Sequence, residues 1–266
     1  MTPWLGRPGS GEAPTSAIVF ASRRICSGDR TGQGYPRAVA LAAVLFDVDF
    51  TLARPGPDLG PEGYARLGAR YELDLDASRY DEARLAAFDT LELHPELEHD
   101  EEVWVLFTER IIRGMGGESE RAYECAVEMT RAWEHAHNFD LYDDVLPTLE
   151  SLRSRGLKLG LISNTARDLD AFVAHHALEV DVALSSRAHG RVKPHESIFL
   201  AALERLGVGA SEAAMVGDTP ADDVDGARAL GIRAFLLDRE GRFPNAESRL
   251  TDLRELPAAL GLGPAR

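Results

Sequence analysis

Two aspartates stand one residue apart at the end of a short apolar run near the beginning of the chain. The run covers residues 39–46 and leads directly into Asp47, Asp49 and Thr51. Such a run is typical of a strand that is buried on both faces of a parallel sheet. Ligands of open α/β sheets bind beyond the carboxyl ends of the strands, where two carboxylates can divide acid and base roles. Taken alone, the same pair also fits a loop or a helix cap.

A second polar cluster follows the next run of strand-like sequence. Ser163 and Asn164 come directly after residues 158–162. A serine hydroxyl and the adjoining backbone N–H groups at the end of a strand can face an anion. The simpler interpretation of either side chain alone is that it caps the helix that follows.

A single lysine, Lys193, lies in the sequence Arg-Val-Lys-Pro of residues 191–194. An ammonium group beside a carboxylate and a phosphoryl group would neutralise charge and hold both. A lysine considered by itself is more often a solvated surface residue.

The fourth cluster is acidic and follows an apolar run at residues 213–216. It contains Asp218, Asp222 and Asp223. Magnesium prefers oxygen ligands and keeps several waters, so Asp218 is the natural direct ligand and Asp223 a holder of metal-bound waters. Acids that complement the dipole of a helix N-terminus are the alternative, and this explains Asp222 better than Asp218.

The chain after residue 141 alternates between strand-like and helix-like segments. This pattern predicts a parallel sheet with helices on both faces. Residues 61–137 are helical in pattern and interrupt the alternation, which indicates an inserted block; in its third helix, Val103, Leu106, Phe107 and Ile111 are expected to form the buried stripe. The expected strands are 39–46, 158–162, 182–185, 213–216 and 233–237, and the expected helices are 63–71, 77–91, 101–114, 119–136, 145–155, 169–176, 197–206 and 221–230.

The composition limits the partners. The 266 residues carry a formal net charge of -15, which disfavours nucleic acid and anionic lipid as partners. The same charge repels phosphorylated small molecules, so a phosphate site needs a local cation. The sequence contains no apolar run of about 18 residues, the length that a membrane span requires. The isolated Cys26 and Cys125 favour a reducing, cytoplasmic location. Residues 1–38 are expected to be a disordered extension or upstream sequence included by a start-site error. The oligomeric state is not defined by the sequence.

Together the four clusters resemble the motifs of the haloacid dehalogenase-like hydrolases, in their phosphatase branch. Residues 47–52 match the first motif, Ser163 the second, Lys193 the third and Asp218 through Asp223 the fourth. The resemblance implies an α/β fold with a Rossmann-like three-layer parallel sheet core and an inserted α-helical cap domain. The core would comprise residues 39–56 and 141–262, the cap residues 57–140, and the hinges residues 55–60 and 138–144.

The resemblance also implies a role for each residue. Asp47 would attack phosphorus and become phosphorylated, and Asp49 would protonate the leaving oxygen and later activate water. The groups expected to hold the phosphoryl group are Thr51, Ser163, Asn164 and Lys193, and those expected to hold Mg²⁺ are Asp47, Asp49 through its backbone carbonyl, Asp218 and Asp223.

Two residues of the first motif refine this expectation. Asp49 is present, whereas dehalogenases of the family lack an acid there, because a leaving halide needs no proton. Phe50 occupies a position where glycine is frequent in the family. The expected function is magnesium-dependent hydrolysis of a small phosphorylated metabolite through an aspartyl-phosphate. The alternatives are a phosphomutase of the same family, which returns the phosphoryl group to a second hydroxyl, and a non-catalytic binding module.

Overall fold

The computed structural model describes residues 40–88, 91 and 93–263. The predicted extension at residues 1–38, with Cys26, lies outside the described residues. Cys125 is a buried free thiol. In the described part of the chain, no helix combines the length and hydrophobicity that a membrane span requires.

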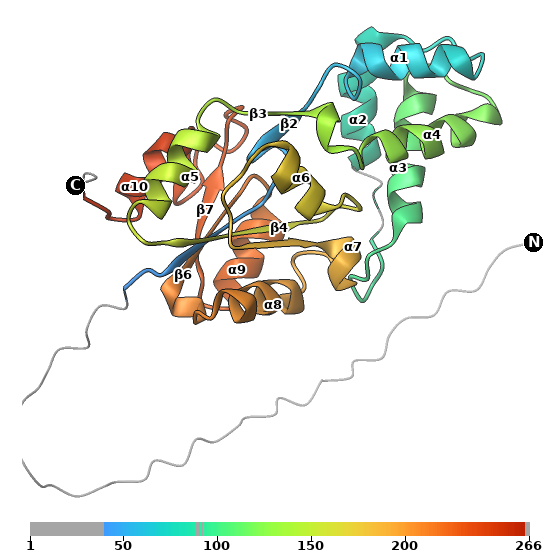
Figure 1. Cartoon of the computed structure of the whole chain (residues 1–266). Helices are drawn as coiled ribbons and strands as arrows, with labels where there is room; N and C mark the ends of the chain where they lie inside the picture. Colours follow the sequence, from blue (N-terminus) through green and yellow to red (C-terminus); the bar gives the residue numbers. More distant parts are fainter. Residues whose placement is uncertain (1–39, 89–90, 92, 264–266) are drawn as a thin grey trace, which may run out of the picture. The chain divides into compact units, whose positions relative to one another are not determined.

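A six-stranded parallel sheet forms the centre of the fold, in the order β5-β4-β1-β6-β7-β8 (Figure 1). The central strand pairs on both sides, so that Phe46 lies beside Leu161 of one neighbour and Val216 of the other. The α/β fold with a parallel sheet is therefore confirmed. The strands are β1 (Ala43–Phe46), β4 (Lys158–Ser163), β5 (Val182–Ser185), β6 (Ala213–Gly217), β7 (Arg233–Leu237) and β8 (Arg249–Leu250).

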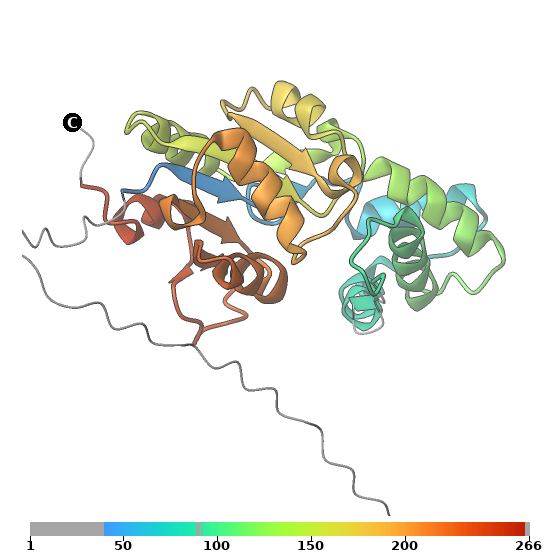
Figure 2. The same cartoon turned by 90° about the horizontal axis from the view of Figure 1, so that it is seen from below.

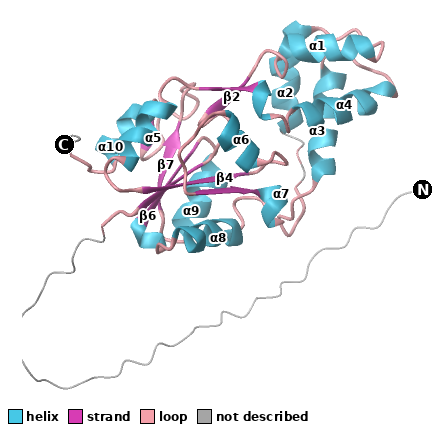
Figure 3. Ribbon diagram, viewed as in Figure 1, coloured by secondary structure: helices cyan, strands magenta, loops and turns pink. Residues whose placement is uncertain are grey.

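Helices cover both faces of this sheet (Figure 3). The side chains of β1 alternate between two apolar cores, with Val44 and Phe46 in one and Ala43 and Leu45 in the other. Burial on both faces explains why this strand is apolar at every position. The first core is covered by α5 (Val145–Arg153), α6 (Leu169–His175) and α10 (Leu256–Ala259), and the second by α8 (Glu196–Leu206) and α9 (Gly226–Ala229).

The predicted helical block is present and lies to one side of the sheet (Figure 2). In the helix at residues 101–114, Asp100 caps the N-terminus, because its carboxylate accepts a hydrogen bond from the Glu102 N–H at 2.9 Å. The predicted stripe of this helix is wrong at Leu106, which is 41% exposed, whereas Val105 is buried. The block consists of α1 (Pro61–Arg70), α2 (Tyr80–Phe88), α3 (Glu101–Gly114) and α4 (Arg121–Ala132).

The two chain segments that join the block to the sheet pair with each other. Strand β2 (Ala53–Pro55) runs antiparallel to β3 (Phe139–Leu141), and the Gly56 N–H extends the pairing to the Asn138 carbonyl at 2.7 Å. The sequence predicted hinges here rather than strands, because three residues are too few to show an alternating pattern. Both connections therefore leave the sheet side by side.

Candidate active site

The polar residues predicted to share a site come from neighbouring strand ends. Asp47 follows β1, Ser163 ends β4 and Asp218 follows β6. Because these strands are parallel and adjacent, their carboxyl ends lie at one edge of the sheet. Lys193 reaches the same edge from the loop after the short helix α7 (Ser186–His189), which the sequence did not predict.

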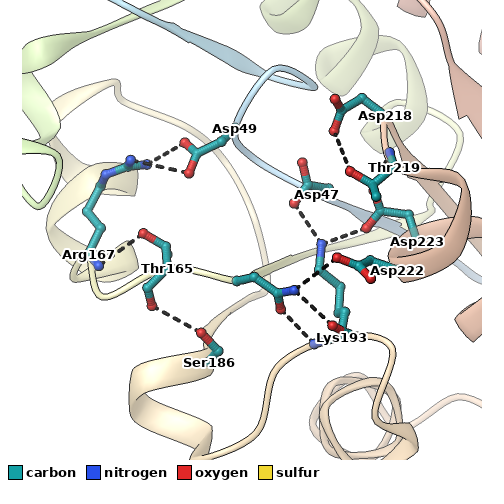
Figure 4. Close-up of polar contacts among 11 residues, drawn as sticks. Asp47, Asp49, Thr165, Arg167, Ser186, Lys193, Asp218, Thr219, Asp222 and Asp223 are labelled. Atoms are coloured by element: carbon teal, nitrogen blue, oxygen red, sulfur yellow. Dashed lines mark hydrogen bonds and ion pairs between the residues drawn. The ribbon is translucent and has the colours of Figure 1, made fainter. Parts of the chain in front are cut away.

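Lys193 is the centre of this cluster (Figure 4). Its ammonium donates to Asp47 Oδ1 at 2.7 Å and to Asp223 Oδ1 at 2.6 Å, and its side chain is only 2% exposed. Burial opposes the charged form of Lys193, but the Asp223 and Asp47 carboxylates outweigh it and raise its pKa. The interpretation of this lysine as a surface residue is therefore wrong.

Burial and mutual repulsion disfavour the charged forms of Asp47 and Asp218 in this cluster. Burial raises the pKa of Asp47 well above its usual range, and the nearby Asp223 and Asp218 add to this effect while Lys193 opposes it. Burial and Asp223 raise the pKa of Asp218 to about 6, against the opposing effect of Arg242. More negative charge is gathered here than Lys193 alone neutralises.

This excess of negative charge fits a divalent cation. One carboxylate oxygen from each of Asp47, Asp218 and Asp223 lies within 4.8 Å of the others. Three carboxylate oxygens are the hard ligands that Mg²⁺ prefers. Asp222 is not part of the group; its carboxylate lies 3.4 Å from the Asn164 amide nitrogen. The side chain of Asp49 is not part of it either.

Asp223 reaches the cluster because of an unusual local backbone. The predicted helix at residues 221–230 begins instead as a π-helical turn, Pro220–Asp225, and becomes α-helical only in α9. Such turns are frequent at functional sites. The end of β6 must also be glycine, since a Cβ at Gly217 would lie 2.2 Å from Asp223 Cγ.

Asn164 positions Lys193. Its amide oxygen accepts the Lys193 N–H at 2.6 Å, and its amide nitrogen donates to the Lys193 carbonyl at 2.9 Å. The cap of α6 is Asp168, whose carboxylate accepts two backbone N–H groups, so Ser163 and Asn164 are not its cap. The phosphate-binding role of Asn164 stays a prediction, because both ends of its amide are used here.

Thr51 lies in the loop that follows Asp47. Its side chain is fully buried, and its hydroxyl has no hydrogen-bond partner among the described residues. The Thr51 carbonyl accepts from Arg239 Nη2 at 2.8 Å, which anchors the loop after Asp47. Phe50 in the same loop has a φ of 62°, in the left-handed region that favours glycine, which explains the glycine common there in the family. Phosphate binding by Thr51 stays a prediction.

Asp49 points away from the other site residues (Figure 4). Its carboxylate pairs with Arg167, with Nη1 2.9 Å from Oδ1 and Nη2 3.4 Å from Oδ2. Arg167 was not predicted as a site residue. The only sequence signal is a basic residue in the loop that follows Ser163 at the end of β4.

The fold and the cluster define an α/β protein with three carboxylates and a buried lysine gathered at the carboxyl ends of its strands. A family model described as haloacid dehalogenase-like hydrolase matches residues 41–231. The chain therefore belongs to the haloacid dehalogenase-like hydrolases, in their phosphatase branch, and the resemblance seen in the sequence is confirmed.

Individual relatives agree with this membership. The phosphoserine phosphatase of Thermus thermophilus is 35% identical, over 80% of this chain and 96% of the relative. The crystal structure of a HAD phosphatase from Thermococcus onnurineus is similar with a TM-score of 0.58 and 30% identity, over 83% of this chain and 98% of that one. A putative HAD-hydrolase from Bacillus subtilis, bound to magnesium, has a TM-score of 0.66 at 18% identity, over 84% of this chain and 100% of that one, which shows the shared fold.

Proposed function

We propose that this protein is a magnesium-dependent phosphatase of small phosphorylated metabolites that uses Asp47 as its nucleophile. The observation that carries the proposal is the Lys193 ammonium bonded to both Asp47 and Asp223, with Asp218 in the same cluster. A buried lysine that holds a carboxylate at a strand end suits an anionic, phosphoryl-bearing ligand.

In the first half of the reaction, an Asp47 carboxylate oxygen forms a bond to phosphorus while the bond from phosphorus to the ester oxygen breaks. For this step Asp49 must turn from Arg167 toward the leaving oxygen in its protonated form; it then gives its proton to that oxygen, and the alcohol departs. Lys193 neutralises charge on the phosphoryl oxygens, and Ser163, buried at the end of β4, contributes its hydroxyl.

In the second half, water attacks phosphorus and its proton passes to Asp49, now a carboxylate. The bond between Asp47 and phosphorus breaks, inorganic phosphate leaves, and both aspartates return to their starting states. Asp47, Asp218, Asp223 and the Asp49 carbonyl would hold the metal. When bound, Mg²⁺ supplies positive charge that offsets repulsion between the anionic substrate and Asp47.

The helical block, residues 57–140, acts as a cap over a core of residues 39–56 and 141–262. Asp47 is 7% exposed, and we expect movement of the block to admit the substrate. The β2–β3 pair connects the block to the core and suits a hinge. The block also contacts the core through the segment before α3. There the His99 N–H donates to the Gly190 carbonyl at 3.1 Å, and the Leu97 carbonyl accepts from the N–H of Val192, the residue before Lys193, at 2.9 Å.

The remaining expectations follow from charge. A chain with a net charge of -15 is a poor partner for nucleic acid or anionic membranes, and its cytoplasmic location stays a prediction. The substrate is a small phosphate ester, because a cap that closes over the site leaves little room for a macromolecule.

A screen of phosphate esters tests the proposal. The panel contains O-phosphoserine, phosphoglycolate, sugar phosphates and nucleoside monophosphates, each with Mg²⁺ and with a chelator. Phosphate release that requires Mg²⁺ and is lost in Asp47→Asn and Asp223→Asn supports it. Asp225→Asn is the matched control, because Asp225 is an exposed acid in the same turn as Asp223.

Two results would oppose the proposal. Turnover of none of the esters removes the phosphatase function. An isomerised phosphate ester without free phosphate indicates a phosphomutase instead.

A further inference from the structure

We propose that Arg167 is a positioning residue that sets the place of the acid–base group Asp49 and ties it to the helical block. The inference rests on the proposed function, since it assigns a partner to Asp49 in that reaction. Its basis is a single guanidinium that contacts Asp49, the end of α4 and the β3 hinge strand.

The guanidinium of Arg167 is held on several sides. Two of its nitrogens face the two Asp49 oxygens, and its Nε donates to the Trp133 carbonyl at 3.1 Å. Its central carbon lies 3.6 Å from the ring centroid of Phe139 and 5.4 Å from that of Phe172. A forked contact to a carboxylate combined with aromatic stacking is specific to arginine.

Burial makes this contact selective. The side chain of Arg167 is 1% exposed, and Asp49 is the only carboxylate among the described residues that pairs with it. A buried charge that loses its partner is strongly destabilising. The pair therefore keeps the Asp49 carboxylate directed toward Arg167, while Lys193 is directed toward Asp47 (Figure 4).

The same guanidinium links Asp49 to the block. Trp133 directly follows α4, and Phe139 begins β3, which is half of the hinge. A shift of the block relative to the sheet displaces the Trp133 carbonyl and the Phe139 ring from Arg167. In the arrangement seen here Arg167 keeps Asp49 turned from Asp47, so the approach of Asp49 to the leaving oxygen depends on a shift of the block, and Arg167 transmits that dependence.

A neighbouring arginine provides the control for a purely structural role. Arg187 also joins the core to the block, since it pairs with Glu101 and with Glu134, each at 2.8 Å. It does not contact Asp49, and its side chain is 47% exposed. Arg187→Gln removes two contacts to the block and leaves Asp49 untouched.

The test is a double-mutant cycle on the turnover of an alkyl phosphate found in the screen. Arg167→Gln should lower kcat by about 10- to 100-fold, less than the loss of up to about 10⁴-fold that removal of an acid–base group gives in Asp49→Asn. KM should change by less than about threefold. The double variant should be no slower than Asp49→Asn, and Arg187→Gln should retain kcat within about threefold.

A conservative variant takes the place of Arg167→Gln in the cycle if Arg167→Gln does not fold. Arg167→Lys keeps the buried charge, so the cycle is then run on it, and its kcat should lie between those of the wild type and of Asp49→Asn. Losses that multiply in the double variant would show that Arg167 does not act through Asp49. If Arg187→Gln lost as much kcat as Arg167→Gln, the effect of Arg167 would come only from holding the block, and its assigned role toward Asp49 would be wrong. An inactive wild-type protein overturns both proposals, whereas multiplied losses in an active enzyme overturn only this one.

Discussion

The two buried cations of the site, Lys193 and Arg167, are held by different parts of the molecule. Lys193 bonds two carboxylates of the sheet edge and is fixed by Asn164, so the side chains that it bonds belong to the α/β core, and the block reaches only the backbone next to it, through Leu97 and Val192. Arg167 bonds one carboxylate and a carbonyl of the helical block. The Lys193 half of the site is thus built by the sheet, whereas the Arg167 half also depends on the block.

The balance of charge differs in the same way. Around Lys193, three carboxylates lie within reach of one another, which leaves negative charge for a divalent cation. Arg167 and Asp49 form a balanced one-to-one pair. We therefore expect the proposed metal on the Lys193 side of the site.

The largest expected effect is that of Lys193→Met. It leaves Asp47 and Asp223 buried without their cation, so we expect no measurable turnover and a loss of about 3–5 kcal/mol in unfolding free energy. Chemical denaturation measures the loss. Lys158→Met is the control and should cost about 1 kcal/mol, because the only bond of the Lys158 ammonium to a described residue is to the Leu206 carbonyl, at 2.5 Å. Similar losses of unfolding free energy in both variants would show that Lys193 contributes no more to stability than Lys158 does.

The second-largest expected effect is the stabilisation of the folded protein by Mg²⁺, which should depend on the Lys193 half of the site and not on the Arg167 half. A cation held by Asp218 and its neighbours stabilises the folded wild-type protein in proportion to ln(1 + [Mg²⁺]/Kd), by about 3 kcal/mol at 100-fold excess over Kd, and so raises its thermal midpoint. Asp218→Asn should abolish this shift, and Arg167→Lys should keep it. A shift that survives in Asp218→Asn would place the metal elsewhere.

Gly217→Ala should have a smaller effect that is confined to the Lys193 half. The new Cβ would lie 2.2 Å from Asp223 Cγ, which forces the carboxylate away from Lys193. We expect a loss of about 1–3 kcal/mol in unfolding free energy and a weaker magnesium shift. Gly263→Ala, whose Cβ would meet no atom within 4 Å, serves as the control. Unchanged magnesium binding in Gly217→Ala would contradict the assigned position of Asp223.

The smallest effect is expected for a third buried pair, Asp144 with Arg239, which lies outside both halves. Burial works against the charged form of Asp144, but the bonds from Arg239 and the Leu253 N–H outweigh it and lower its pKa. The stabilisation is therefore present above the unfolded value of about 3.9 and is lost as pH falls through the lower folded value. The difference in unfolding free energy between wild type and Asp144→Asn should shrink in that acid range. A difference that grows in acid would reverse the assigned sign.

Much of the Lys193 half could be predicted from sequence. Asp47, Ser163 and Asp218 each follow an apolar run, and parallel strands necessarily bring those positions to one edge. Lys193 is also one of only two lysines among 29 basic residues, in a chain that otherwise uses arginine. What positions it, the Asn164 amide, depends on a contact between distant loops and leaves no pattern in the sequence.

The Arg167 half could not be predicted in the same way. The partners of Arg167 come from three separate segments, around Asp49, Trp133 and Phe139, and no periodicity relates them. The buried face of α3 was misplaced for a similar reason, because packing against neighbouring helices decides which of its apolar residues are covered. The turn at Pro220–Asp225 looks helical in sequence, and its wider π geometry is visible only in three dimensions.

Trapping the covalent intermediate tests the central claim most directly. The protein is mixed with a phosphate ester that it hydrolyses, quenched in acid within its turnover time, digested and examined by mass spectrometry. We expect one phosphoryl group on the peptide that contains Asp47, and none in Asp47→Asn. Phosphorylation of another residue, or an Asp47→Asn variant that still releases phosphate at the wild-type rate, would contradict it.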